Sequence, residues 1–543
     1  MNGAIRAIIQ TIKRPGYHIL SLIISLLYGG SLYYYGSGVI MIITGILMMY
    51  SLITFIFIPL LDNLSLKLDL FGAKNGKSRL LPYTLILFII WLPFLIIKYP
   101  GGVQPDTWEM IFRYYHGIMD DKQSVFYSLM INLFVFTGER TASADAGLFA
   151  FLTLQHLLNC FCFAYAFSFL DLLGTRPAVR YAILILTILN PYIIGYVGTA
   201  IKDVPFSSIL LLITVMLAEH HLDPERFHKS PLRITVLILS VLLLCFLRNN
   251  GIYIVLITCL FLVFLIRKNR PNLKLFIWLL SGVLLFLMTN AIVFKACNVY
   301  VQPTGYREAL SIPFQQTARY VRDHSDDITP EEYGIIDENL TIDTLASRYD
   351  PRISDPVKNG YEGDKSGLAG YFKVWGQEFL RHPMTYVDAT WEQNRSLLLP
   401  SESAENYAFT KDYTTGYEGN ICYVGGGTVI PGLFTSPEGL LDAKETVIRI
   451  CIGMLSAPVI TCVWNVACST IALIIIAGMS LIKKIRDAYY LCPLLSVLLI
   501  TIAGPVIMGH PRYMFPVIFA MPFIIVYFLY LNSRSDKQDA CQC

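Results

Sequence analysis

The sequence predicts an all-α polytopic membrane protein with about twelve transmembrane helices and a mixed extracytoplasmic domain. Its 543 residues are 55% hydrophobic and 15% charged, whereas about a quarter of the residues in a soluble globular chain are charged. Apolar stretches of roughly 20 residues, long enough to cross a bilayer, alternate with short loops. One long polar segment, residues 298–458, interrupts this alternation.

The predicted spans are the stretches in which apolar residues predominate over the width of a bilayer. They lie near residues 18–36, 38–61, 81–98, 147–171, 181–200, 204–219, 233–248, 251–267, 275–296, 461–482, 488–508 and 513–531. Arg6, Lys13 and Arg14 precede the first span, but no small-residue cleavage site follows. We therefore expect a retained first helix and not a cleaved signal peptide.

The basic residues between these spans fall on one side of the membrane. That side holds Lys67, Lys74, Lys77, Arg79, Arg176, Arg180, Arg226, Lys229, Arg233, Arg267, Lys268, Arg270, Lys274, Lys483, Lys484 and Arg486. Because cytoplasmic loops carry the excess of Lys and Arg, we expect both termini to be cytoplasmic. The net charge of +3 is too small to indicate a nucleic-acid partner, so membrane lipids are the expected surroundings.

Two segments do not fit the pattern of simple spans. Residues 99–146 follow the third span on the outer side, and their apolar part, Ser124–Gly138, is expected to lie at the interface because it is too short to cross comfortably. The chain thus divides into a transmembrane module, residues 1–297, an extracytoplasmic domain, residues 298–458, and a C-terminal part, residues 459–543, with the last helices and a cytoplasmic tail.

The polar segment 298–458 has its own local patterns. Glu331–Ile336 and Tyr371–Leu380 have helical patterning, whereas Gly425-Gly426-Gly427 and Pro431-Gly432 predict a loop-rich remainder. Its size is that of an ordinary domain. Three cysteines lie in or beside the segment, and either a disulfide among them or unpaired thiols would suit the sequence: Cys297, Cys422 and Cys451.

The first candidate for chemistry is Asp106, in the loop Tyr99-Pro100-Gly101-Gly102-Val103-Gln104-Pro105-Asp106 directly after the third span. Glu109 follows one helical turn later. A carboxylate at a membrane surface can accept a proton from a sugar hydroxyl or bind a divalent cation. The alternative is a structural role, with Asp106 capping a helix over residues 107–115.

Two further candidates are outer-side cations. Lys202 is a compact cation suited to binding a phosphate, and the adjacent Asp203 could orient Lys202 or act as a second acid. The structural alternative is an interfacial ion pair between the two residues. Arg248, followed by Asn249, interrupts an apolar stretch on the predicted outer side, against the positive-inside trend. A phosphate partner is plausible there, and a turn satisfied by lipid headgroups is the alternative.

The last two candidates lie late in the chain and in the polar segment. His510, Arg512 and Tyr513 join the last two spans, where Arg512 offers paired donors to a phosphate and Tyr513 an interfacial ring. The aromatic belt alone would also explain Tyr513. Near its start the polar segment carries Glu308-Ala309-Leu310-Ser311-Ile312-Pro313-Phe314-Gln315-Gln316. Gln315, Gln316 and Arg319 share a helical spacing and suit sugar hydroxyls. A solvated helix face is the more common meaning of this spacing.

At Asp106, the Lys202-Asp203 pair and Arg512-Tyr513, the chain resembles the polytopic bacterial glycosyltransferases of the GT-C superfamily, which use polyprenyl-phosphate sugars outside the membrane. It looks more closely like an uncharacterised bacterial family within that group, and the likeness covers most of the chain topologically. Two helices precede the one leading to Asp106, and no Asp-Asp or Asp-Glu pair stands there. The sequence therefore leaves open which residue is the second acid and whether the protein uses a metal. A divalent cation is the only cofactor that it suggests.

The resemblance and the outer-side residues together predict an enzyme of the bacterial plasma membrane. It would transfer a sugar from a polyprenyl-phosphate donor to an envelope glycan, lipid or protein acceptor, with inversion. Asp106 would be the base, and Lys202, Arg248 and Arg512 would hold the phosphate. A transporter or flippase of a lipid-linked saccharide is the alternative, for which His156 and Asn159 are the main polar groups well inside a span. A non-catalytic assembly or sensor protein is the third.

Overall fold

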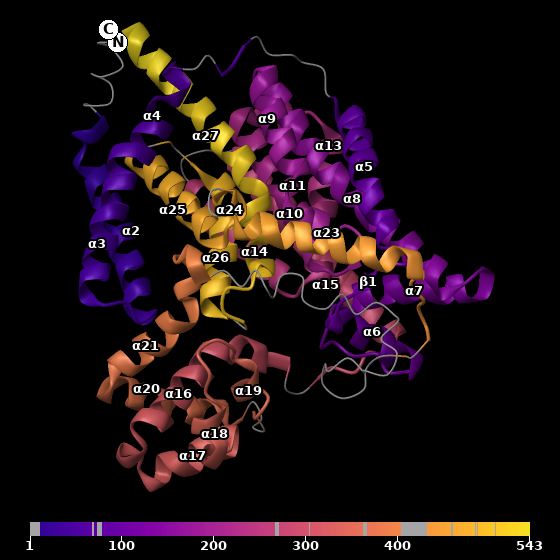
Figure 1. The fold of residues 1–543 in the computed structure, drawn as a ribbon, viewed down its shortest axis with the longest axis vertical. Helices are drawn as coiled ribbons and strands as arrows, with labels where there is room; N and C mark the ends of the chain where they lie inside the picture. Colours follow the sequence, from indigo (N-terminus) through magenta and orange to yellow (C-terminus); the bar gives the residue numbers. More distant parts are fainter. Residues whose placement is uncertain are drawn as a thin grey trace.

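The computed structural model describes the backbone of most of the chain, and this part is almost entirely helical (Figure 1). The described residues are 11–67, 70–72, 79–266, 271–302, 305–361, 366–402, 430, 432–457, 460–483, 485, 487–504 and 507–542. Some residues used in the predictions, such as Lys74, Cys422, Gly425-Gly426-Gly427 and Pro431, lie outside them. The described part has one two-stranded sheet, β1 (Gly102–Val103) and β2 (Thr199–Ala200).

Apolar helices make up most of the molecule. They are α2 (Pro15–Tyr34), α3 (Val39–Leu52), which continues through a π-helix (Ile53–Phe57) into α4 (Ile58–Lys67), α5 (Leu80–Ile97), α8 (Ala144–Leu172), α9 (Pro177–Ile188), α10 (Pro191–Tyr196), α11 (Asp203–Leu222), α13 (Pro231–Leu247), α14 (Asn250–Ile266), α15 (Pro271–Ala296), α25 (Val466–Ile482), α26 (Cys492–Ala503) and α27 (Phe515–Gln542). In the described chain, seven apolar helices are long enough to cross a membrane and five more are shorter.

These helices overlap each predicted span, but two of the predicted spans are broken. Residues 461–482 divide at Asn465 into α24 (Thr461–Trp464) and α25. The span expected over residues 181–200 is broken into α9 and α10 at Asn190-Pro191. The Asn190 side chain accepts a hydrogen bond from the Tyr192 backbone N–H at 2.9 Å, and Pro191 begins the new helix. An N-cap followed by proline starts a helix, so the chain turns here before it reaches β2.

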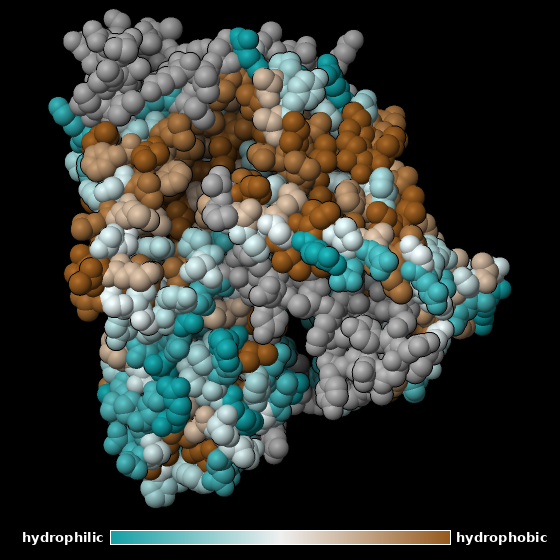
Figure 2. All heavy atoms as spheres, viewed as in Figure 1, coloured by the Kyte–Doolittle hydropathy of each residue, from teal (hydrophilic) through white to brown (hydrophobic). Residues whose placement is uncertain are grey.

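The apolar helices differ in how much of their surface other helices cover. α11 is 94% buried and packs against α8, α13 and α27, whereas the segment containing α3 is only 17% buried. Ile40 on α3 is 83% exposed and Leu81 on α5 is 68% exposed. Figure 2 shows apolar side chains spread over this part of the surface. Exposed apolar helix faces around a buried central helix are the arrangement of a membrane protein.

Two helices run across the direction of the long helices in Figure 1: α7 (Val125–Thr141) and α23 (Glu438–Ser456). α7 begins where Ser124 accepts a hydrogen bond from the Tyr127 N–H at 3.1 Å, which confirms a helix over the predicted interfacial segment. α23 packs against α5 and α10 and buries Val447, Cys451 and Leu455 in the core of the apolar helices. These buried residues therefore belong to the core of the apolar helices and not to the separate core that contains Phe314 and Leu340.

The first part of the polar segment folds into a small helical domain with a separate core, and we call residues 311–394 the helical domain. It comprises α16 (Ser311–Asp323), α17 (Pro330–Leu340), α18 (Ile342–Arg348), α19 (Asp355–Lys358), α20 (Leu368–Arg381) and α21 (Pro383–Asn394). Phe314, Leu340, Leu345 and Tyr371 are buried at its centre. Helices at the predicted positions 331–336 and 371–380 are confirmed as α17 and α20. Hydrophilic side chains cover much of the domain surface in Figure 2.

The helical domain is attached to the end of α2. The Tyr34 hydroxyl donates to Asp388 on α21, and Arg395 NH1 donates to the Tyr34 carbonyl at 2.6 Å. The Trp391 ring lies against Gly30, where a Cβ would stand 2.6 Å from the indole. The opposite ends of the apolar helices are joined by Asp62 and Lys483. The domain therefore lies at one end of the helix bundle, and the start of α2 and the end of α27 lie at the other (Figure 1).

Candidate functional site

A short parallel pairing brings two distant loops together at the domain end of the bundle. Gly102 and Val103 pair with Thr199 and Ala200, and the Thr107 hydroxyl donates to the Ala200 carbonyl at 2.8 Å. The loop that leads into β1 needs a glycine, because Gly101 has a φ of +140° and a Cβ there would stand 2.0 Å from Leu152 Cδ1. The pairing places the loop of Asp106 beside the loop of Lys202.

Asp106 lies in the first turn of α6 (Pro105–Tyr115), and the prediction that it caps this helix is wrong. Gln104 occupies the cap position and Pro105 is the first helical residue. Proline favours that first position, which places Asp106 inside the helix. A negative charge there is stabilised by the helix dipole, while its side chain stays 46% exposed. The carboxylate can therefore meet an incoming molecule.

The ion pairs at the site differ from the expected ones. Lys202 Nζ lies 3.8 Å from Asp106 Oδ2, and it also donates to the side chain of Gln123. Asp203 is paired with two arginines instead, with Arg248 NH1 at 2.5 Å and Arg512 NH1 at 3.7 Å. Asp203 therefore does not orient Lys202 as expected, and each of the two residues pairs with a different segment. The reason is that Asp203 begins the buried helix α11, where its side chain is only 6% exposed.

Neighbouring side chains hold the two arginines. Arg512 Nε donates to His510 Nε2 at 3.0 Å, and the guanidinium of Arg248 lies 5.5 Å from the Phe206 ring centre and 5.9 Å from that of Tyr513. Burial, together with Arg512 and Arg248, lowers the pKa of His510 well below its usual value, so His510 is neutral and accepts this hydrogen bond. Of the predicted residues, the structure thus brings together Asp106, Lys202, Asp203, Arg248, His510, Arg512 and Tyr513.

Cations outnumber carboxylates by one among the described ion pairs of this cluster, in which Lys202, Arg248 and Arg512 contact Asp106 and Asp203. Burial raises the pKa of Asp106, but Lys202, Arg512 and Arg248 outweigh it and hold the pKa below its usual value. Burial lowers the pKa of Lys202, while Asp106 and Asp203 oppose that shift. The cluster is positively charged and has one accessible, ionised carboxylate.

Two predicted residues lie at the margin of this cluster. Glu109 on α6 accepts from Arg113 and from Lys122, each at 2.7 Å. It is therefore part of an ion-pair network on the helix that carries Asp106. Asn249 is exposed in the turn next to Arg248. Neither residue is in an ion pair or side-chain hydrogen bond with Asp106 or Asp203 among the contacts of the described chain.

The three predicted residues of the helical domain are directed into that domain. Gln315 Nε2 donates to the Asp350 and Ile353 carbonyls at 2.9 and 3.0 Å, and Gln316 donates to the Thr390 hydroxyl at 2.8 Å. Arg319 binds Glu392 at 2.6 Å. The helical spacing was interpreted correctly, but these side chains face the domain interior, so we leave them out of the candidate site.

Sequence reasoning missed three contributors. Gln123 contacts Lys202, and Phe206, one turn into α11, lies against Arg248. Lys98, at the end of α5, is 1% exposed and directs Nζ to the Thr199 hydroxyl at 3.3 Å and to the Gly195 carbonyl. The sequence does single out Lys98, because a lysine at the predicted outer end of a span runs against the positive-inside rule. Lys98 holds the turn from which β2 begins.

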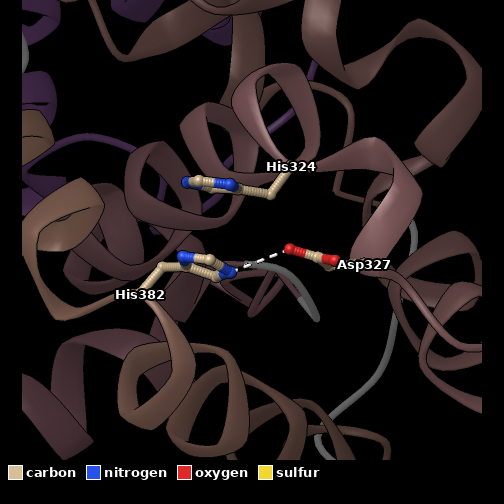
Figure 3. A group of neighbouring side chains, drawn as sticks. All are labelled: His324, Asp327 and His382. Carbon is tan, nitrogen blue, oxygen red and sulfur yellow. Dashed lines mark hydrogen bonds and ion pairs between the residues drawn. The ribbon is translucent and has the colours of Figure 1, made fainter.

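Among the described residues, one group of side chains has the His and Asp ligands typical of a metal site. This group lies in the helical domain and not at the cation cluster. His324, Asp327 and His382 have ligand atoms within 4.8 Å of one another (Figure 3). The two rings are stacked with centroids 3.8 Å apart at 14°, and His382 Nε2 lies 2.9 Å from Asp327 Oδ2. Ring nitrogen lone pairs lie in the ring plane, so two nearly parallel rings would have to rotate before both could bind one ion. The arrangement is that of a hydrogen-bonded stack.

Comparison with known proteins places the chain in a family without assigning it an activity. The model of a family of unknown function (DUF6020) matches residues 115–542, which include Lys202, Asp203, Arg248 and Arg512. Asp106 and Glu109 precede the matched residues. No curated protein and no solved structure matches the chain. Because the match covers most of the sequence, the chain belongs to the family of unknown function DUF6020.

Proposed function

We propose that this protein is an inverting membrane glycosyltransferase that moves a sugar from a polyprenyl-phosphate carrier to a cell-envelope acceptor. The observation that carries the proposal is the cluster itself: three cations, from three separate segments, converge beside one accessible carboxylate at the end of the apolar helices. A lipid-borne phosphate and a water-borne hydroxyl can meet at such a place. The resemblance to the GT-C superfamily at the same residues supports this assignment.

The phosphate would bind among Lys202, Arg248 and Arg512. Guanidinium groups offer paired N–H donors to phosphate oxygens, and Lys202 adds a compact positive charge. Asp203 positions both arginines before a ligand arrives, because each has an Nη1 atom near it. The same three cations would stabilise the charge that collects on the phosphate as the bond to the sugar breaks.

Asp106 is the better base of the two carboxylates. It is 46% exposed and has one cation near its oxygens, whereas Asp203 is 6% exposed and lies between two guanidinium groups. Asp106 would accept the proton of an acceptor hydroxyl while that oxygen bonds to the anomeric carbon. The bond from this carbon to the phosphate oxygen breaks, and polyprenyl phosphate leaves with the electron pair. A single displacement of this kind inverts the anomeric centre.

The proposed orientation puts the cluster and the helical domain outside the bacterial plasma membrane and both termini in the cytoplasm. We also propose that all twelve apolar helices cross the membrane, with tilt or local thinning accommodating the five shorter ones. The basic residues that predict this orientation include exposed Lys229 between α11 and α13, at the far end of α11 from Asp203. The positive-inside rule assigns that end to the cytoplasm.

A transporter or flippase of a lipid-linked saccharide is the second candidate, because polar groups inside a span are typical of transporters. His156 and Asn159 are buried midway along α8. His156 lies against the rings of Phe88 and Trp91, which is a packed environment and not a water-lined path among the described residues. This packing favours the enzyme.

Incubation of the purified protein with a panel of polyprenyl-phosphate sugars and envelope acceptors tests the proposal. We expect release of polyprenyl phosphate by the wild type and by Arg449→Gln, a variant at an exposed site on α23, and release roughly 100-fold slower or less by Asp106→Asn. In parallel, vesicles containing the protein and a fluorescent polyprenyl-phosphate sugar would report flipping. Flipping without sugar release would replace the enzyme by the transporter.

A further inference from the structure

The helical domain carries an open groove that the proposed mechanism has not used. Its volume is about 750 Å³, and its walls come from the end of α18, the loop before α19, and the residues around the end of α21. Volumes of 300 to 1,000 Å³ are usual for sites that bind small molecules. The groove is therefore large enough for a ligand of that class.

One wall of the groove is joined to the segment that carries Arg512. Ile353 pairs with Ile507 in an antiparallel bridge, and the Met508 N–H donates to the Arg352 carbonyl at 2.8 Å. Gln315 holds this wall from the other side through its two bonds to the Asp350 and Ile353 carbonyls. His510 and Arg512 follow Met508 by two and four residues, so the groove wall is bonded to the segment that supplies Arg512 to the cation cluster.

The groove lining combines donors and acceptors with little net charge. The lining holds the guanidinium groups of Arg348, Arg352 and Arg395 and the carboxylates of Asp350 and Glu392. Arg395 Nε is also paired with a further carboxylate, that of Glu402, at 3.3 Å. Arg352 NH2 and Nε are 2.9 and 3.1 Å from the Asp350 carboxylate. A phosphate or another strong anion would have to displace a carboxylate there, and a hydrocarbon chain would exclude water from these polar groups without forming hydrogen bonds to them. A hydroxyl-rich molecule can donate to the carboxylates and accept from the guanidinium groups at once.

From this position and chemistry we propose that the groove binds the acceptor, and that the part of the acceptor it holds is a neutral, hydroxyl-rich saccharide. The proposal rests on the proposed function, because it names the molecule that would receive the sugar. Loop 350–353 then has two tasks: it forms a wall for the acceptor, and it fixes the segment that places Arg512 on the donor phosphate.

The test uses a bulky side chain in the groove and a matched one outside it. Ser347 and Thr344 are both exposed on α18, and only Ser347 lines the groove. Purified, labelled full-length protein is applied to an array of neutral, acidic and amino-substituted oligosaccharides. We expect the wild type and Thr344→Trp to be retained on neutral saccharides, and Ser347→Trp to lose retention at least tenfold. Equal retention of the two variants, retention only on acidic saccharides, or no retention of the wild type would each overturn the proposal.

Donor binding, measured on the same proteins, separates this proposal from the proposed function. Binding of polyprenyl phosphate should be unchanged in Ser347→Trp, because that residue lies outside the cation cluster. If the wild type binds neutral saccharides at the groove but no polyprenyl phosphate, the groove stands and the donor assignment fails. If it binds polyprenyl phosphate but Ser347→Trp matches Thr344→Trp on the array, the groove assignment fails and the donor site stands.

Discussion

Asp106 Oδ2 and Lys202 Nζ lie 3.8 Å apart although Asp106 is on α6 and Lys202 directly precedes α11, because Gly102 pairs with Thr199 just before each of them. This pairing fixes the backbone on both sides of the contact. It also separates the functions of the two carboxylates, since Asp106 stays accessible while Asp203 is enclosed by arginines. The variants that follow exploit this difference.

Asp106→Asn keeps the size of the side chain and removes its ability to accept a proton. We expect turnover to fall by roughly 100-fold or more while folding and donor binding survive. Release of polyprenyl phosphate and donor affinity measure the two effects. Because neighbouring cations hold the pKa of Asp106 below its usual 3.8 despite burial, the carboxylate is ionised at neutral pH. The base-dependent rate should therefore fall on acidification only at a lower pH than an ordinary aspartate would require.

Asp203→Asn is the comparison for this variant. Loss of its charge leaves Arg248 and Arg512 without their shared partner, so we expect weaker donor binding and lower stability as well as lower turnover. Normal turnover in Asp106→Asn with an inactive, folded Asp203→Asn would move the base to Asp203. Full activity in both would rule out a mechanism with a single carboxylate base.

Arg512→Ala should weaken binding of polyprenyl phosphate by about 2 to 5 kcal/mol, because it removes one partner of a desolvated charge pair. Arg512→Lys keeps the charge but loses the planar pair of donors and the Nε bond to His510, so an intermediate affinity is expected. Equilibrium binding of polyprenyl phosphate measures both. Arg449→Ala, at an exposed position on α23, should bind like the wild type. Wild-type affinity in Arg512→Ala would remove this residue from the donor site.

The orientation can be tested with single cysteines and an impermeant thiol reagent in intact cells. The twelve native cysteines are first replaced by serine, and Thr344→Cys and Lys229→Cys are then made separately in that background. We expect labelling at position 344 on the helical domain and none at 229 before the membrane is permeabilised. Ser354 in the same domain is 0% exposed and would be a poor probe. Labelling at 229 alone would place the cation cluster in the cytoplasm and contradict the proposed function.

Glu378 on α20 makes the stability of the helical domain depend on pH. Burial raises the pKa of its carboxyl to about 8, so the folded domain keeps a proton that the unfolded chain releases near pH 4.5. The free energy of unfolding should therefore decrease as the pH rises from about 4.5 to 8, by an amount on the order of 3 to 5 kcal/mol, and then level off. Hydrogen exchange of the α20 and α21 amides in the full-length protein, corrected for intrinsic rates, measures this.

Glu378→Gln imitates the protonated form and should remove most of that pH dependence. Glu331→Gln, at an exposed position in the same domain, should leave it unchanged. A pH dependence in Glu378→Gln equal to that of the wild type would assign the effect to other groups.

Much of the helix arrangement was predictable because long apolar stretches have few alternatives to a helix in lipid. The break between α9 and α10 was also visible in Asn190-Pro191, since a cap and a proline there outweigh the apolar residues around them. The β1–β2 pairing could not be predicted from the sequence. A strand of two residues is too short to show the alternation of polar and apolar residues that marks a strand, and the two strands are far apart in the chain. Only the fold shows which loops meet.

The partners of the charged residues were less predictable than their location. Lys202 and Asp203 are neighbours in the chain, but Asp203 begins α11 and faces two arginines while Lys202 reaches Asp106. Adjacent residues at a helix start point in different directions, so their proximity in sequence did not predict a pair. Similarly, the spacing of Gln315 and Arg319 predicted a shared helix face, but it could not tell whether that face meets water or the interior of a domain.

The near-complete enclosure of α11 has a consequence for how the protein tolerates different membranes. This helix carries Asp203 at its start, and 94% of it is covered by other parts of the protein. The outer helices, such as α3, meet the lipid and can tilt as bilayer thickness changes. Since α11 is supported by protein on all sides, the height of Asp203 and its two arginines is set by internal packing. We therefore expect the affinity for polyprenyl phosphate to vary little between bilayers of short and long acyl chains.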